Sequence, residues 1–116
     1  VIGGAPGMQG AAILAAHAAL AAGAGRTRLG LLAKDTPPSL RPECLRVDRA
    51  LMCEPEHLAR CTVVCGCGGG QDVQQLMTPV LQHSARLVLD ADGLNAIAGN
   101  EAWTQLLRQR ARRSIR

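Results

Sequence analysis

Three short motifs in this chain share one order: an apolar strand-like run, a turn rich in glycine or aspartate, and a helix-like segment. They lie at residues 1–10, 63–70 and 87–92. This repeated order predicts an α/β fold with a mostly parallel sheet, because each helical crossover brings the chain back to start another strand in the same direction. The turns then meet at the carboxyl edge of the sheet, where ligands bind in open α/β sheets. We therefore expect a small-molecule site there, suited to a ligand that carries phosphate.

The composition suits a single domain over residues 1–116 with a core of small and aliphatic side chains. Trp103 is the only aromatic residue, since the chain has no Phe and no Tyr. Nucleic-acid binding by base stacking is therefore not expected, because it needs several exposed rings.

The positive charge is concentrated at the end of the chain. Five of the 13 basic residues fall within residues 108–116, whereas all nine acidic residues lie at or before Glu101. A basic tail can bind nucleic acid or a membrane. We favour a solvated helix end, because arginine near a helix carboxyl terminus interacts favourably with the helix dipole. We therefore expect neither a nucleic-acid nor a membrane partner.

Five cysteines and the absence of a signal-like or membrane-spanning apolar run predict a cytoplasmic protein with reduced thiols. Cys61, Cys65 and Cys67 invite comparison with zinc sites, but no second pair has the spacing that structural zinc requires. We expect no metal site among them and interpret them as small buried residues.

Hydrophobic patterning predicts the elements around the turns. Residues 11–22 are apolar on nearly every side, which predicts a buried helix, and His17 is interpreted as a hydrogen-bonded or helix-edge residue. Residues 27–31 alternate as a half-buried strand does. Residues 40–60 predict short surface pieces of strand and helix.

The second half of the chain has clearer signals. Residues 71–83 carry one apolar stripe, and Pro79 within them predicts a kink or a late start. Residues 87–89 predict a third buried strand, followed by a short helix in which Leu94 and Ile97 share a face. Asn100 is a suitable N-cap for a last helix that carries Trp103, Leu106 and Leu107 on one side.

The glycine turns have both a functional and a structural interpretation. Glycines at 66–70 allow a backbone to approach a ligand closely, and the helix start near Gln71 presents free N–H groups to anions. The loop from Gly3 to Gly10 offers the same close approach and free N–H groups at the start of the helix predicted for residues 11–22. Each turn can instead be a tight strand-to-helix connection that touches no ligand. Asp90 and Asp92 together can hold Mg²⁺ through water or orient a ligand hydroxyl. Alternatively, Asp90 hydrogen-bonds local backbone and Asp92 caps the next helix, which is the interpretation we favour for Asp92.

Together these turns resemble the ADP- or ATP-dependent NAD(P)H-hydrate dehydratases, a family related to carbohydrate kinases. The segments that carry the likeness are Gly3–Gly4 with Gly10-Ala11-Ala12, Pro42-Glu43, residues 66–70, and Leu89-Asp90-Ala91-Asp92-Gly93-Leu94-Asn95. The last of these is close to the family's Leu-Asp-Ala-Asp-Ala-Leu-Asn. The likeness covers roughly residues 1–100.

The resemblance implies a three-layer ribokinase-like fold and repair of hydrated NADH or NADPH by loss of water, with ADP or ATP and Mg²⁺. Ala11 and Gly68 would lie against the hydrated cofactor, and Asp90 near metal and phosphates. A homo-oligomer is expected for the full-length protein. The expected binding residues are Gly4, Gly10, Ala11, Gly66, Gly68, Asp90 and Asn95.

The sequence also departs from the family. Cys67 and Gly69 replace its Pro and Leu, and the family's Thr-Pro-His-Pro-Gly-Glu, Lys-Gly and Gly-Thr-Gly-Asp segments are not found. The last of these carries the catalytic aspartate, so we expect a truncated, partial domain with no catalytic residue that is inactive alone, and an atypical basic tail at 108–116.

Two other functions remain open at this point. Residues 64–70 resemble the glycine-rich loop of S-adenosylmethionine-dependent methyltransferases, although the acidic residue that usually precedes that loop is missing. A non-catalytic interaction module that uses the arginine tail is the second alternative.

Overall fold

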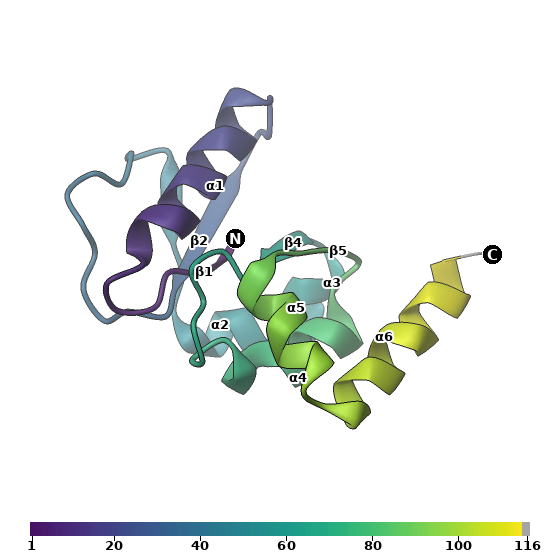
Figure 1. Cartoon of the computed structure of the whole chain (residues 1–116). Coiled ribbons are helices and arrows are strands. Elements are labelled where there is room, and N and C mark those ends of the chain that lie inside the picture. The colour runs from purple at the N-terminus through teal and green to yellow at the C-terminus, as the bar shows by residue number, and fades with distance from the viewer. Residues whose placement is uncertain (115–116) are drawn as a thin grey trace.

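A computed structural model describes residues 1–114 and shows a five-stranded sheet in which every paired strand is parallel. The spatial order is β3-β2-β1-β4-β5, so β1 lies at the centre (Figure 1). The strands are β1 (Ile2–Gly3), β2 (Thr27–Leu31), β3 (Cys44–Arg46), β4 (Thr62–Cys65) and β5 (Arg86–Leu89).

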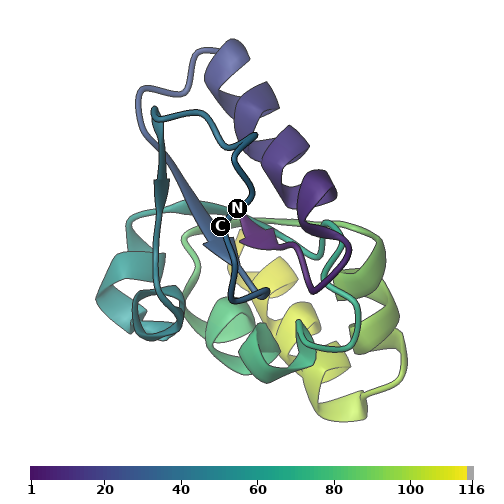
Figure 2. The same ribbon diagram turned by 90° about the vertical axis from the view of Figure 1, so that its left-hand side faces the viewer.

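Helices lie on both faces of this sheet, which confirms the predicted three-layer α/β fold. They are α1 (Gln9–Ala21), α2 (Arg49–Cys53), α3 (Pro55–Ala59), α4 (Gln74–His83), α5 (Ala91–Ala98) and α6 (Glu101–Ser114). Figure 2 shows α1 on one side of the strands and the green and yellow helices α4 to α6 on the other.

Two apolar clusters fill the spaces between these layers. The smaller joins α1 to β2 and β3 through Ala12, Ile13, Ala16, Leu29, Leu31 and Cys44. The larger lies on the opposite face and is built around the buried stripe of Val73, Leu76, Met77, Val80 and Leu81. This stripe is the one that the sequence predicted for α4.

The expectation that the first helix is buried on nearly every side is wrong. Only Ala12, Ile13 and Ala16 of α1 are buried, and Leu14 keeps 70% of its surface exposed. No second layer covers α1 within residues 1–114. The prediction failed because alanine makes a helix apolar all round and does not indicate which side is packed. His17 accepts a hydrogen bond from the backbone of Arg41, which agrees with a helix-edge position.

The third strand and the helix after it also differ from expectation. β5 is an edge strand and not a buried one, and Val88 is 53% exposed. Leu94 is half exposed and does not share the packed face of α5 with Ile97. The buried residues of that helix are Gly93, Ala96 and Ile97. The apolar residues in the sequence did not by themselves indicate which side of these elements is buried.

The remaining elements agree with their sequence patterns. Residues 40–60 form the short pieces β3, α2 and α3, although Met52 and Leu58 reach the core. α4 begins at Gln74, later than the predicted residue 71, and still contains Pro79. Asn100 caps α6 by accepting from the Trp103 N–H at 3.1 Å. β2 is more buried than predicted, since Gly30 lies under Met52.

The arginine-rich end continues α6 as a regular helix up to Ser114, and the last two residues of the tail lie outside the described residues. Arg110 donates to the backbone oxygen of Leu81 at 3.0 Å, whereas Arg108, Arg112 and Arg113 are exposed. Of the helices described, none combines the length and the apolarity needed to cross a membrane.

Candidate functional site

The first two glycine turns meet beside the central strand. The chain passes from β1 outward to β2 and β3 and then crosses to β4 on the other side, so the strand order reverses between β1 and β4. In open α/β sheets, ligands bind outside the carboxyl ends of the strands at such a reversal. There the Gly4 N–H donates to the oxygen of Cys67 at 2.9 Å, and the Ala5 N–H donates to Gly68 at 2.7 Å.

The aspartate motif joins the same rim through two further hydrogen bonds. The Asp90 N–H donates to the oxygen of Cys65 at 2.9 Å. The Asp92 carboxylate accepts from the Gly70 N–H at 2.8 Å and so ties the start of α5 to the second glycine turn. All three motifs therefore lie at one edge of the sheet, as their sequence order predicted.

Two of the glycines are required by contacts between the turns themselves. A Cβ on Gly66 would lie 2.5 Å from the Asp90 oxygen, and one on Gly68 would lie 2.5 Å from the Met8 oxygen. Both residues also have positive φ, at 116° and 58°, which side chains disfavour. The structural interpretation of this turn thus accounts for these glycines without a ligand.

Gly10 and Ala11 are different, because they face open space. Both are exposed in the first turn of α1, and a Cβ on Gly10 would meet nothing within 4 Å. No side chain caps this helix and no acidic residue occupies its first turn, so its amino end can accept an anion. Ala11 also lies beside the second turn, 3.0 Å from a Cβ placed on Gly68.

The two aspartates do not play the structural roles that the sequence indicated. Asp90 stands at the N-cap position of α5, but its exposed carboxylate makes no capping hydrogen bond. Asp92 is not the cap, since its carboxylate bonds Gly70 instead. This link between Asp92 and Gly70 has no signal in the sequence, because it joins residues 22 positions apart.

Asn95 is exposed on α5, and within residues 1–114 no hydrogen bond joins its side chain to a glycine turn. The structure therefore brings Gly4, Ala11, Gly66, Gly68 and Asp90 together, places Gly10 on the same loop in the open, and leaves Asn95 without such a contact.

Two thiols lie directly beneath the rim. Burial raises the pKa of Cys65 to about 12. Burial, and then its interactions with the Asp90 carboxylate, also raise the pKa of Cys67. Both side chains thus stay protonated at neutral pH and are poor nucleophiles, since the thiolate is the reactive form.

The residues of the rim do not by themselves form a site for Mg²⁺. Among residues 1–114, no group of three or more His, Cys, Asp or Glu side chains gathers in metal-binding geometry. One Asp92 oxygen accepts from Gly70, and the only other carboxylate of the aspartate motif, Asp90, interacts with the Cys67 thiol. Hard divalent cations require several oxygen ligands.

The parallel three-layer sheet, with its glycine turns gathered at the switch point, defines the class as a ribokinase-like α/β protein. Comparison with known proteins identifies the family within this class, because a family described as NAD(P)H-hydrate dehydratase matches residues 1–114. This match extends beyond residue 100, where the resemblance noted in the sequence ended. The chain belongs to the NAD(P)H-hydrate dehydratase family. This membership favours the interpretation as part of a dehydratase over the two alternatives, a methyltransferase-like domain and a non-catalytic interaction module.

One similar protein is the bifunctional NAD(P)H-hydrate repair enzyme Nnr of Coxiella burnetii, with 38% identity over 104 residues. The aligned part covers 84% of this chain but only 21% of that enzyme, so the chain spans about a fifth of its relative's length. No solved structure matches the chain.

Proposed function

We propose that this chain supplies the part of an NAD(P)H-hydrate dehydratase that holds the hydrated dinucleotide substrate. The observation that carries the proposal is the meeting of all three family-like motifs at the switch point between β1 and β4. Membership of the family and the repair function in the relative's name support the choice of substrate.

The residues at the rim divide into two groups in this proposal. Gly4, Gly66 and Gly68 hold the turns at close range, while Gly10 and Ala11 offer exposed backbone to the phosphates or the ring of the ligand. The exposed Asp90 carboxylate lies at the same edge beside the Cys67 thiol, where it can orient a ligand hydroxyl or contribute one ligand to a shared metal ion. Asn95 is an outlying member of the set.

The reaction itself is proposed to need groups beyond these residues. ADP or ATP with Mg²⁺ would act together with the family's Gly-Thr-Gly-Asp aspartate, and that motif does not occur in the 116 residues. We further propose that the whole enzyme works as a cytoplasmic homo-oligomer.

Calorimetry of the 116-residue chain with hydrated NADPH tests the binding half of this proposal. We expect saturable binding that Gly10→Val weakens about tenfold or more, because a side chain there would occupy the ligand's side of the loop, which is equivalent to about 1.4 kcal/mol. Leu14→Gln, on the exposed side of α1, is the matched control and should bind as the parent does. Absence of binding by the parent chain would refute the proposal.

An activity assay tests the other half. With hydrated NADPH, Mg²⁺ and either ADP or ATP, the chain alone is expected to show no loss of the hydrate above the uncatalysed rate. Sustained turnover would contradict the view that the catalytic aspartate must come from outside these residues.

A further inference from the structure

The end of β2 lies beside the glycine loop that follows β1. Just beyond β2, the Ala33 N–H donates to the oxygen of Gly4 at 3.0 Å, which continues the parallel pairing of the two strands as far as the first glycine turn. The exposed residues Lys34 and Asp35 follow directly. They therefore leave the sheet at the same rim as the three motifs.

A side-chain contact holds Asp35 at the start of α1. The Gln9 side-chain amide donates to both carboxylate oxygens of Asp35, at 3.4 Å each. Gln9 is the first residue of α1, and its Cα lies 3.2 Å from the position of a Cβ on Gly4. The first turn of α1 has no acidic residue of its own, so Asp35 supplies a negative charge beside the exposed backbone of Gly10.

Two basic residues near this end of β2 are arranged differently. Arg46, the last residue of β3, donates from one guanidinium nitrogen to the backbone oxygens of Ala33 and Lys34, at 3.0 and 2.8 Å. It thus fixes the course of the chain after β2. In the part of the chain that the structure describes, no ion pair joins Lys34 to Asp35. The Asp35 carboxylate is therefore a charged group that its own contact ties to the glycine loop.

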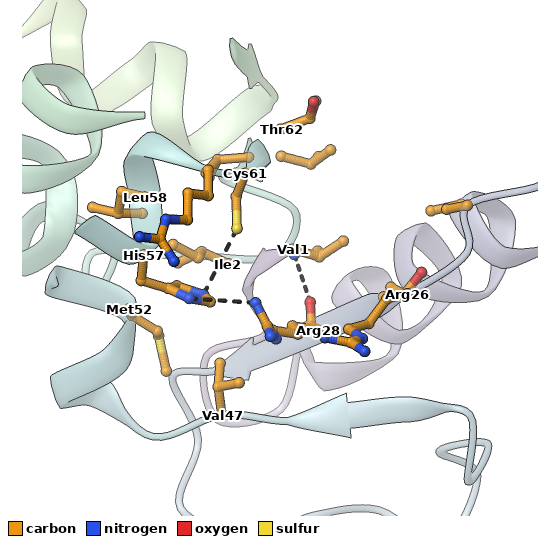
Figure 3. A pocket seen from close by; sticks show the side chains of 16 residues that line it. Val1, Ile2, Arg26, Arg28, Val47, Met52, His57, Leu58, Cys61 and Thr62 are labelled. Carbon is orange, nitrogen blue, oxygen red and sulfur yellow. Dashed lines mark hydrogen bonds between the residues drawn. The ribbon is translucent and has the colours of Figure 1, made fainter. Parts of the chain in front are cut away.

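Other basic side chains gather at the opposite edge of the sheet. Arg26, Arg28 and Arg60 line a cavity at the amino ends of β2 and β4. Figure 3 shows Arg28 next to His57, with 3.3 Å between its guanidinium and the ring Nδ1. Because these arginines lie at the far ends of the strands from the glycine turns, they do not offset the charge of Asp35 at the rim.

The sheet has the strand order of dinucleotide-binding α/β sheets. Its five strands are arranged 3-2-1-4-5. In sheets of that order the pyrophosphate lies at the start of the first helix, and an acidic residue near the end of the second strand hydrogen-bonds the ribose 2′-hydroxyl of NAD. A cationic residue in that region accommodates the 2′-phosphate of NADP instead. Asp35 follows the second strand here and lies against the first helix.

From this geometry we propose that Asp35 contacts the 2′ position of the ribose and selects hydrated NADH over hydrated NADPH. This selection rests on the function proposed above, in which the rim holds the hydrated dinucleotide. The two hydrates carry the same hydrated ring and differ only at this ribose position. The 2′-hydroxyl of hydrated NADH donates to the carboxylate, whereas the 2′-phosphate of hydrated NADPH brings a like charge against it.

Calorimetry of the 116-residue chain with each hydrate, at the same pH and salt concentration, tests the selection. We expect the Kd for hydrated NADH to be about tenfold or more below that for hydrated NADPH, because like charges placed together disfavour the wrong partner. Asp35→Asn is expected to remove most of this difference by tightening the binding of hydrated NADPH. The amide oxygen can still accept from the 2′-hydroxyl but carries no charge.

Two variants serve as controls. Glu56→Gln removes one negative charge from the first turn of α3, next to a residue that lines the cavity at the amino edge, and should leave the ratio of the two Kd values unchanged. Gln9→Ala keeps the net charge of the chain and removes the group that holds Asp35, so it should lower the ratio without abolishing the binding of hydrated NADH. An effect of net charge alone would appear in Glu56→Gln and not in Gln9→Ala, and would overturn the selection.

The other outcomes are distinct. Equal Kd values for the two hydrates in the parent chain would overturn the selection and leave the proposed function standing. Tighter binding of hydrated NADPH that Lys34→Gln reversed would assign the ribose position to Lys34 and would also overturn it. Equal loss of affinity for both hydrates in Asp35→Asn would give Asp35 a structural role only. Failure of the parent chain to bind either hydrate would refute the proposed function and the selection together.

Discussion

At the scale of single residues, two glycines from the same rim have different reasons to be glycine. Gly68 has a φ of 58° and a neighbouring backbone oxygen where its Cβ would stand, whereas Gly10 lies in a helix with free space around it. The first is needed by the fold. Gly10 is not required by such a contact and is available to bind a ligand.

We therefore expect Gly68→Ala to lower the free energy of unfolding by about 1–3 kcal/mol, through backbone strain and the clash with Met8. Gly10→Ala should raise it by about 0.5–1 kcal/mol, because alanine favours a helix. Urea unfolding of both variants checks this. A stable Gly68→Ala protein would show that the turns can separate without cost.

In the 116-residue chain, the amino group of Val1 makes stability depend on pH. Burial lowers its pKa below the usual value of about 8. As pH falls below about 8, the unfolded chain takes up a proton that the folded chain does not yet bind, so the free energy of unfolding decreases. The limiting slope for one proton is about 1.4 kcal/mol per pH unit.

Acetylation of that amino group should flatten this dependence between pH 7 and 8, since the amide keeps an N–H for Arg28 but cannot be charged. Thermal unfolding across this range measures it. His57, whose pKa is lowered by burial and then by Arg28, acts below about pH 6.5 and remains as an internal control in both proteins. Identical slopes above pH 7 would contradict the role given to Val1.

At the scale of elements, α1 is the clearest test of one-sided packing. Ile13 is buried against the sheet and its neighbour Leu14 is exposed. Ile13→Ala should cost about 2–4 kcal/mol of unfolding free energy, whereas Leu14→Ala should change it by less than about 0.5 kcal/mol. Denaturant titration compares the two. Similar losses would mean that something covers the outer face of α1.

The sequence predicted elements and their shared edge better than it predicted exposure. Strand–turn–helix order fixes a parallel sheet, and so Gly4, Gly68 and Asp90 met as expected. Leu14, Val88 and Leu94 were misassigned, because an apolar residue is compatible with a buried face and does not create one. The bond from Gly70 to Asp92 depends on tertiary geometry that local patterns do not contain.

At the scale of the whole molecule, the sheet ends in β5 on one side. Its outer edge has no strand partner within residues 1–114, and Val88 and Leu94 are both half exposed near it. Open edges and exposed apolar residues favour association between chains.

We expect the 116-residue chain to associate reversibly as its concentration rises, and Val88→Lys to weaken this association, because a charge on an edge strand opposes pairing. Sedimentation velocity over a range of concentrations measures both proteins. Leu14→Lys adds the same charge away from that edge and serves as the control. A parent chain that stays monomeric throughout would contradict the expectation.

The central place of β1 has a consequence for the order of events during synthesis. Residues 1–3 are made before either flanking strand, yet their partners are Gly30 and Cys65. The middle of the sheet must therefore wait, unpaired, until more than sixty residues have left the ribosome. Contacts so far apart along the chain slow folding. A nascent chain stalled before β4 would therefore hold β1 with only one of its two strand partners.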